Sequence, residues 1–84
     1  MFARVKSHVF IDTVRLEVES APEARVRAVL RDEAGRVCST LEKTLRGSSQ
    51  DITWEGLNHL PYGVYTLELS EGADEMKLRM VKRV

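Results

Sequence analysis

Three side chains of this protein could take part in nucleophilic or metal chemistry, namely Cys38, His8 and His59. A nucleophilic cysteine needs a basic histidine within hydrogen-bond reach, but these residues lie far apart in the sequence and no other residue is spaced to orient such a pair. A structural zinc site needs a full set of closely spaced ligands, which this chain lacks. A cysteine within a strand is more often a small buried apolar residue. We therefore expect no catalytic residue and no metal ligand among them.

The remaining polar motifs give no sign of catalysis either. Asp32-Glu33 and Asp74-Glu75 are adjacent acids in predicted turns, where neighbouring side chains project to different sides and do not form a paired-carboxylate site. The Gly47-Ser48-Ser49 segment lacks the lysine that follows the glycines of a phosphate-binding loop. These patterns predict a protein that is not an enzyme and that uses no cofactor and no small-molecule substrate.

The charges balance over the whole chain but not along it. Thirteen Lys and Arg residues face thirteen Asp and Glu residues, so the net charge gives no reason to expect nucleic acid or an anionic membrane as a partner. Residues 47–76 contain acids but no Lys or Arg, whereas residues 77–84 contain four bases and no acid. Such blocks are usually solvated surface, and the alternative is that the basic terminal segment is a recognition element.

The size of the chain limits it to one thin core. A protein of 84 residues buries only about 60–65% of the surface that its unfolded chain exposes, so we expect a single domain over residues 1–84, in monomeric form. Cys38 is the only cysteine, which excludes an intramolecular disulfide. Residues 1–10 contain no continuous apolar run, so they predict neither a signal peptide nor a membrane span. If the domain acts outside the cell, we expect it to be part of a longer precursor.

Alternating apolar and polar residues predict several short strands. The pattern is uninterrupted over residues 13–19, and it recurs over 62–70 and 75–84, which a short polar loop with Gly72 would join as a hairpin. Shorter candidate strands lie at residues 2–6, 36–44 and 50–54. These elements are typical of an all-β protein.

Residues 24–31 fit two structures. As a strand they would place Val26, Ala28 and Leu30 on one face, and the neighbouring strands favour this interpretation. As a helix over residues 22–34 they would start after Ser20 and end at Gly35, and the fold would then be α+β.

About seven short strands separated by turns predict an immunoglobulin-like antiparallel β-sandwich. The alternation assigns thirteen apolar residues to its core: Val14, Leu16, Val18, Val26, Leu30, Val37, Ile52, Trp54, Tyr65, Leu67, Leu69, Leu78 and Met80.

Four segments resemble a known family in their order and spacing. They are Asp32-Glu33-Ala34-Gly35-Arg36-Val37, then Ile52-Thr53-Trp54, then Leu60-Pro61-Tyr62-Gly63-Val64-Tyr65, and a basic terminal strand Lys77-Leu78-Arg79-Met80-Val81-Lys82. Over roughly residues 9–84 the chain resembles the C-terminal sorting domain of Bacteroidetes type IX secretion cargo, an Ig-like domain. The family's usual Asn-Pro opening is absent, and Val9-Phe10-Ile11-Asp12 stands in its place.

The resemblance implies a domain that is recognised by the outer-membrane secretion machinery and that sends its cargo to the cell surface or the medium. It implies recognition residues in the last hairpin (Gly63, Tyr65, Lys77, Arg79, Lys82 and Arg83) and turn residues Asp32 and Gly35. The final strand would be an exposed sheet edge that a partner reads through its backbone and charges. The alternative is an Ig-like accessory or stand-alone module that binds a protein or a glycan.

Overall fold

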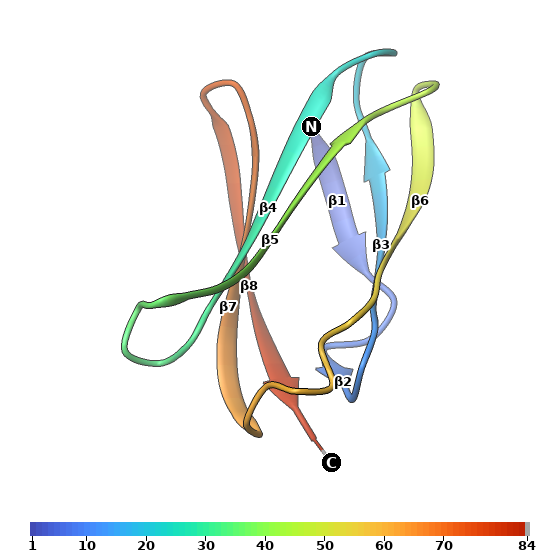
Figure 1. Ribbon diagram of the computed structural model, residues 1–84. Helices are drawn as coiled ribbons and strands as arrows, with labels where there is room; N and C mark the ends of the chain where they lie inside the picture. Colours follow the sequence, from blue (N-terminus) through green and yellow to red (C-terminus); the bar gives the residue numbers. More distant parts are fainter. Residues whose placement is uncertain (84) are drawn as a thin grey trace.

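The computed structural model describes residues 1–83, which form eight β-strands joined by turns and loops (Figure 1). No helix in this range could cross a membrane. Val84, the last residue of the predicted terminal strand, lies outside the described residues. The strands are β1 (Phe2–Val5), β2 (Val9–Phe10), β3 (Val14–Glu19), β4 (Arg25–Arg31), β5 (Val37–Thr44), β6 (Ser49–Trp54), β7 (Gly63–Glu71) and β8 (Asp74–Lys82).

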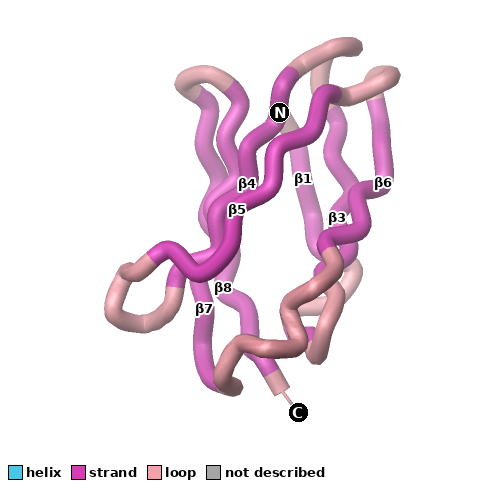
Figure 2. The backbone as a smooth tube through the Cα atoms, in the orientation of Figure 1, coloured by secondary structure: helices cyan, strands magenta, loops and turns pink. Residues whose placement is uncertain are grey.

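The strands form two facing sheets, as predicted for an Ig-like β-sandwich. One sheet has the order β1-β3-β6 and the other the order β2-β8-β7-β4-β5. Figures 1 and 2 show β1, β3 and β6 on the right and β7 and β8 on the left, while β4 and β5 run diagonally from the left side to the upper right. The short β2 lies at the lower right in Figure 1. All pairs are antiparallel except that of β2 with β8, which is parallel. The prediction of an all-β sandwich is therefore confirmed.

The period-2 patterns produce the core because successive side chains of a strand point to opposite faces. Along β3, Val14, Leu16 and Val18 are buried, and they lie beside Trp54, Ile52 and Gln50 of β6 in register. Facing them from the other sheet are buried residues of β4, β7 and β8. Of the predicted core residues, Leu78 is half-buried against this cluster and all the others except Val37 are fully buried.

Residues 25–31 form a strand, so the alternative of a helix over residues 22–34 is wrong. β4 pairs with β5 on one side and with β7 on the other, and Val26, Ala28 and Leu30 point into the core. Two rows of interstrand hydrogen bonds and a fully apolar inner face outweigh the local helix-start signals. Glu23 instead belongs to the turn before β4, where it has φ of 65° and its backbone N donates to the Leu45 carbonyl.

Val37 was predicted to be in the core, but its side chain is 52% exposed. The reason is a register shift in β5 next to Leu30 and Arg31, which places Val37 opposite Arg31. Such a bulge moves the residues beyond it to the other face of the sheet. The strand alternation also missed several buried residues in loops and short elements: Ala3, Phe10, Leu45, Leu57 and Leu60.

β5 is the uncovered edge of the larger sheet, because it pairs with β4 alone. Its eight residues offer a long row of backbone groups on the side away from β4. Lys43 lies opposite the buried Val26, on the inward face of this strand, and yet it is exposed to solvent. A charged side chain thus occupies the inner face of the sheet at its open edge.

Candidate recognition site

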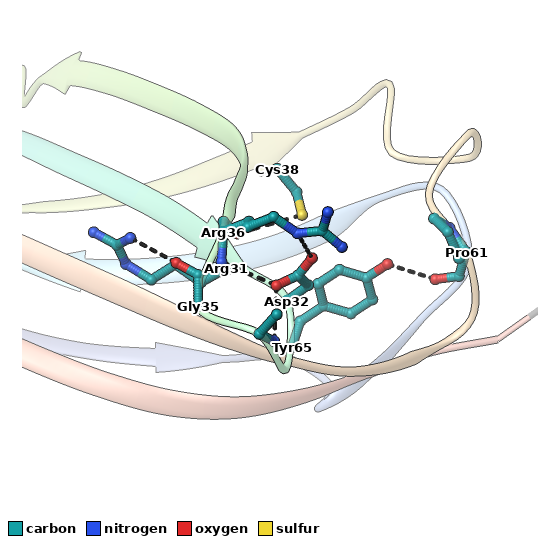
Figure 3. A network of polar contacts seen from close by, with 8 residues as sticks. Arg31, Asp32, Gly35, Arg36, Cys38, Pro61 and Tyr65 are labelled. Atoms are coloured by element: carbon teal, nitrogen blue, oxygen red, sulfur yellow. Dashed lines mark hydrogen bonds and ion pairs between the residues drawn. The ribbon is translucent and has the colours of Figure 1, made fainter.

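The β4–β5 turn and the β6–β7 loop meet at one end of the sandwich, although about 25 residues separate them in the sequence (Figure 3). Both line one shallow depression of about 350 Å³. The last residues of β8 reach the same end, since Lys82 pairs with Gly63 at the start of β7. We call this region the motif end; it consists of residues 32–36, 61–65 and 81–83.

Asp32 holds the β4–β5 turn through hydrogen bonds to the backbone. Its Oδ1 accepts from the amides of Ala34 and Arg36, each at 2.9 Å, and its Oδ2 lies 3.1 Å from the Arg36 Nε (Figure 3). Gly35 has φ of 83°, a conformation that favours glycine. The backbone hydrogen bond from Arg36 is the main cause that lowers the pKa of Asp32 below its ordinary value of 3.8. The turn predicted from Asp32 and Gly35 therefore forms, with the aspartate ionised.

Asp32→Ala is expected to lower the midpoint of thermal unfolding at pH 7, because the two turn amides lose their acceptor. The folded state depresses the pKa of Asp32, so its contribution is present above the ordinary value of 3.8 and is lost as the pH falls through the folded-state pKa. Melting curves of the two proteins should therefore converge in acid. Glu33→Ala is the control, since Glu33 is exposed. An equal loss in both variants at pH 7 would contradict this role of Asp32.

Tyr65 is anchored in the core and does not face solvent. Its side chain is buried, its ring meets that of Phe10 edge to face at 6.1 Å, and its hydroxyl donates to the Pro61 carbonyl at 2.6 Å (Figure 3). A tyrosine that bonds back to the preceding corner is a recurrent device of Ig-like sandwiches. Gly63, between them, has φ of 152°, which side-chain-bearing residues rarely adopt. Tyr65 and Gly63 thus shape the motif end from within.

The four basic residues of the last strand differ in their exposure. Lys77, Arg79 and Arg83 are exposed, whereas Lys82 points inward, is 3% exposed and donates from Nζ to the Arg83 carbonyl at 2.8 Å. Lys77 lies 3.8 Å from Glu68. Within residues 1–83, Arg79 and Arg83 form no ion pair. These two arginines therefore remain available to an acidic partner, and Lys82 does not.

The expectation that the final strand is an exposed edge is wrong at its C-terminal part. β2 pairs with it in parallel, and the Val81 amide donates to the His8 carbonyl at 2.8 Å. The Arg83 amide donates to the Phe10 carbonyl at 2.9 Å, and the His8 Nδ1 lies 2.9 Å from the Arg79 carbonyl. β2 could not be predicted from the sequence, because a strand of two residues is too short to show an alternating pattern.

In the part of the chain that the structure describes, no hydrogen bond joins Cys38 to either of the two histidines. Cys38 is half-buried, with its Sγ 3.6 Å from the Arg36 carbonyl, and His59 is exposed in the β6–β7 loop. Within residues 1–83, no group of three or more His, Cys, Asp or Glu side chains could hold a metal ion. The motif end offers an exposed turn, the exposed Tyr62 and Arg83, which forms no ion pair within residues 1–83, and such a surface suits contact with another macromolecule.

No family model matches this chain, and no curated protein is significantly similar to it.

Proposed function

We propose that this domain is a non-catalytic sorting domain, through which an exported cargo protein is recognised by the outer-membrane machinery of type IX secretion. In this role the domain is a substrate of that machinery and directs its cargo to the cell surface or the medium. The protein partner binds exposed residues of the motif end and of β8.

One observation carries the proposal. The Asp-x-x-Gly turn and the Leu-Pro-x-Gly-x-Tyr segment line the same depression, and the basic terminal strand ends beside them. Segments of a chain that fold to one place can form a single binding surface, whereas motifs that serve only their own turns have no need to meet. Their convergence supports a shared recognition role.

The position of the N-terminus also supports it. The Met1 amino group lies 2.7 Å from Asp74 Oδ2, beside the β7–β8 hairpin, at the end of the sandwich away from the motif end (Figure 1). A cargo fused before Met1 would therefore leave the motif end accessible to a partner.

The test fuses the domain to the C-terminus of a periplasmically exported reporter and measures release from type IX-competent and type IX-deficient cells. Release should occur only from competent cells. Arg79→Glu/Arg83→Glu should reduce it about tenfold or more, as loss of a charge-complementary contact does. Deleting residues 77–84 is a weaker test, because it removes the buried Met80 and unfolds the core.

Arg25→Glu/Arg46→Glu is the matched control. Both arginines are exposed, neither forms an ion pair within residues 1–83, and they lie at the opposite end of the sandwich, where they line another depression. Equal loss of release in the two double variants would attribute the effect to total charge. Absence of type IX-dependent release from the wild-type fusion would reject the sorting role.

The second candidate is an Ig-like module that binds a protein through strand addition. The uncovered edge of β5 favours it, because an extended peptide can hydrogen-bond to such an edge. Equal release of the reporter from competent and deficient cells would favour this candidate.

A further inference from the structure

The exposed apolar side chains of this domain gather near one end. Among residues 1–83, five large apolar side chains are exposed: Phe2, Val9, Ile11, Val37 and Tyr62. All except Phe2 belong to the motif end or to the segments next to it, namely β2, the start of β5 and the β6–β7 loop. Single exposed apolar residues are ordinary, but a group of them rimmed by polar residues is typical of an interaction site.

Register places three valines side by side on the outer face of the larger sheet. Val9 of β2 lies opposite Val81 of β8, and Val81 lies opposite Val64 of β7. Their neighbours Phe10, Lys82 and Tyr65 point inward and are buried, so the valines face outward. We call Val9, Val81 and Val64 the valine row. It crosses three strands that come from both ends of the sequence.

A depression lies beside the valine row on each side. Val9 and Ile11 line one depression of about 430 Å³, and Tyr62 and Val64 line the depression of about 350 Å³ at the motif end. Along β8, Arg79 and Arg83 stand on either side of Val81 on the same outward face, and neither has an ion-pair partner within residues 1–83. The surface is thus apolar along its middle, with Arg79 and Arg83 beside it on β8 and with the acids Asp12, Asp32 and Glu33 in the flanking depressions.

We propose that the valine row, with Ile11 and Tyr62, is the docking surface for a protein of the export machinery whose contact region is apolar at its centre and carries acidic groups opposite Arg79 and Arg83. This inference rests on the proposed sorting function and adds to it that recognition needs the folded sandwich. A linear C-terminal signal would use β8 alone, whereas this surface requires β2, more than 60 residues earlier.

The side chains of this docking surface favour a protein as the partner rather than a membrane. Membrane-binding faces usually carry large anchors such as Trp, Phe or Leu and a cluster of Lys and Arg residues. The valine row is built from short β-branched side chains, and the chain has a net charge of +0. Apolar strips with separate charges suit the core-and-rim organisation of protein interfaces.

The test uses the same reporter fusion with substitutions far from the C-terminus. Val9→Ser/Ile11→Ser, and separately Tyr62→Ser, should reduce release from type IX-competent cells about tenfold, as truncation of central apolar contacts does. Phe2→Ser is the control, because Phe2 is 57% exposed but lies on β1 of the other sheet; its release should stay within about twofold of wild type. Thermal unfolding of the purified variants checks that each one folds.

Each outcome separates the two proposals. If the wild-type fusion is released only by competent cells and the Val9→Ser/Ile11→Ser fusion is folded and released equally well, the docking surface is wrong and the sorting function stands. If Phe2→Ser reduces release as strongly, the apolar surface has no special role and the inference fails. Sedimentation of the purified domain with phosphatidylglycerol vesicles, lost in Val9→Ser/Ile11→Ser, would assign the surface to membrane and overturn the protein partner.

Discussion

Leu67→Ala is expected to lower the urea midpoint of unfolding more than any substitution of an exposed residue does. Leu67 is fully buried in β7, a central strand, and lies beside Leu30 of β4 and Leu78 of β8. Truncating a buried leucine lowers the free energy of unfolding by about 2–5 kcal/mol, through lost apolar burial and the cavity left behind. A domain of this size has a total of only about 4–12 kcal/mol.

Urea denaturation followed by the fluorescence of the buried Trp54 measures this effect. The midpoint should fall sharply. Val37→Ala is the control, because its side chain is 52% exposed and its removal should change the free energy of unfolding by less than about 0.5 kcal/mol. Similar midpoints for Leu67→Ala and Val37→Ala would mean that the assigned core is wrong.

Tyr65→Phe is expected to lower the free energy of unfolding by about 1–2 kcal/mol, because it removes a buried hydroxyl that donates to the Pro61 carbonyl at 2.6 Å and leaves the ring in place. Burial raises the pKa of Tyr65 above its ordinary value of 10.0. The neutral phenol is therefore favoured in the folded state, and its contribution is present below pH 10 and is lost as the pH rises through the folded-state pKa.

Urea midpoints measured from pH 7 to pH 11 test both the loss of stability in Tyr65→Phe and the pH dependence of the wild type. Wild type should lose stability at the alkaline end more steeply than Tyr65→Phe does. Tyr62→Phe is the matched control, because Tyr62 is 71% exposed and its hydroxyl makes no hydrogen bond within residues 1–83. A Tyr65→Phe protein as stable as Tyr62→Phe would show that the hydroxyl bond to Pro61 does not support the corner.

The sequence could predict most of the fold because alternation is a direct consequence of strand geometry. Val14, Leu16 and Val18 follow the pattern without exception, and their strand has the expected bounds within a residue. The pattern failed at Val37, where a bulge shifts the register, since no local residue preference marks the shift. Phe10 was missed because its strand is too short for a period to show.

The candidate site was harder to predict, because it depends on contacts between distant segments. The Asp32 turn could be predicted from its own residues. The pairing of Val9 with Val81 could not, since it arises from a parallel strand near the other end of the chain. The sequence shows that the terminal segment is basic, but the arrangement of the sheet determines which of its basic side chains are exposed to solvent.

The uncovered edge of β5 also bears on how this protein behaves at high concentration. Two copies could pair edge to edge through β5 and extend the sheet, which is how many β-proteins begin to aggregate. Lys43 opposes this, because a continuous sheet across two copies would enclose its ammonium group between apolar layers, away from water. An inward lysine at this edge therefore disfavours edge-to-edge association of two copies, at the expense of one apolar position in the sheet.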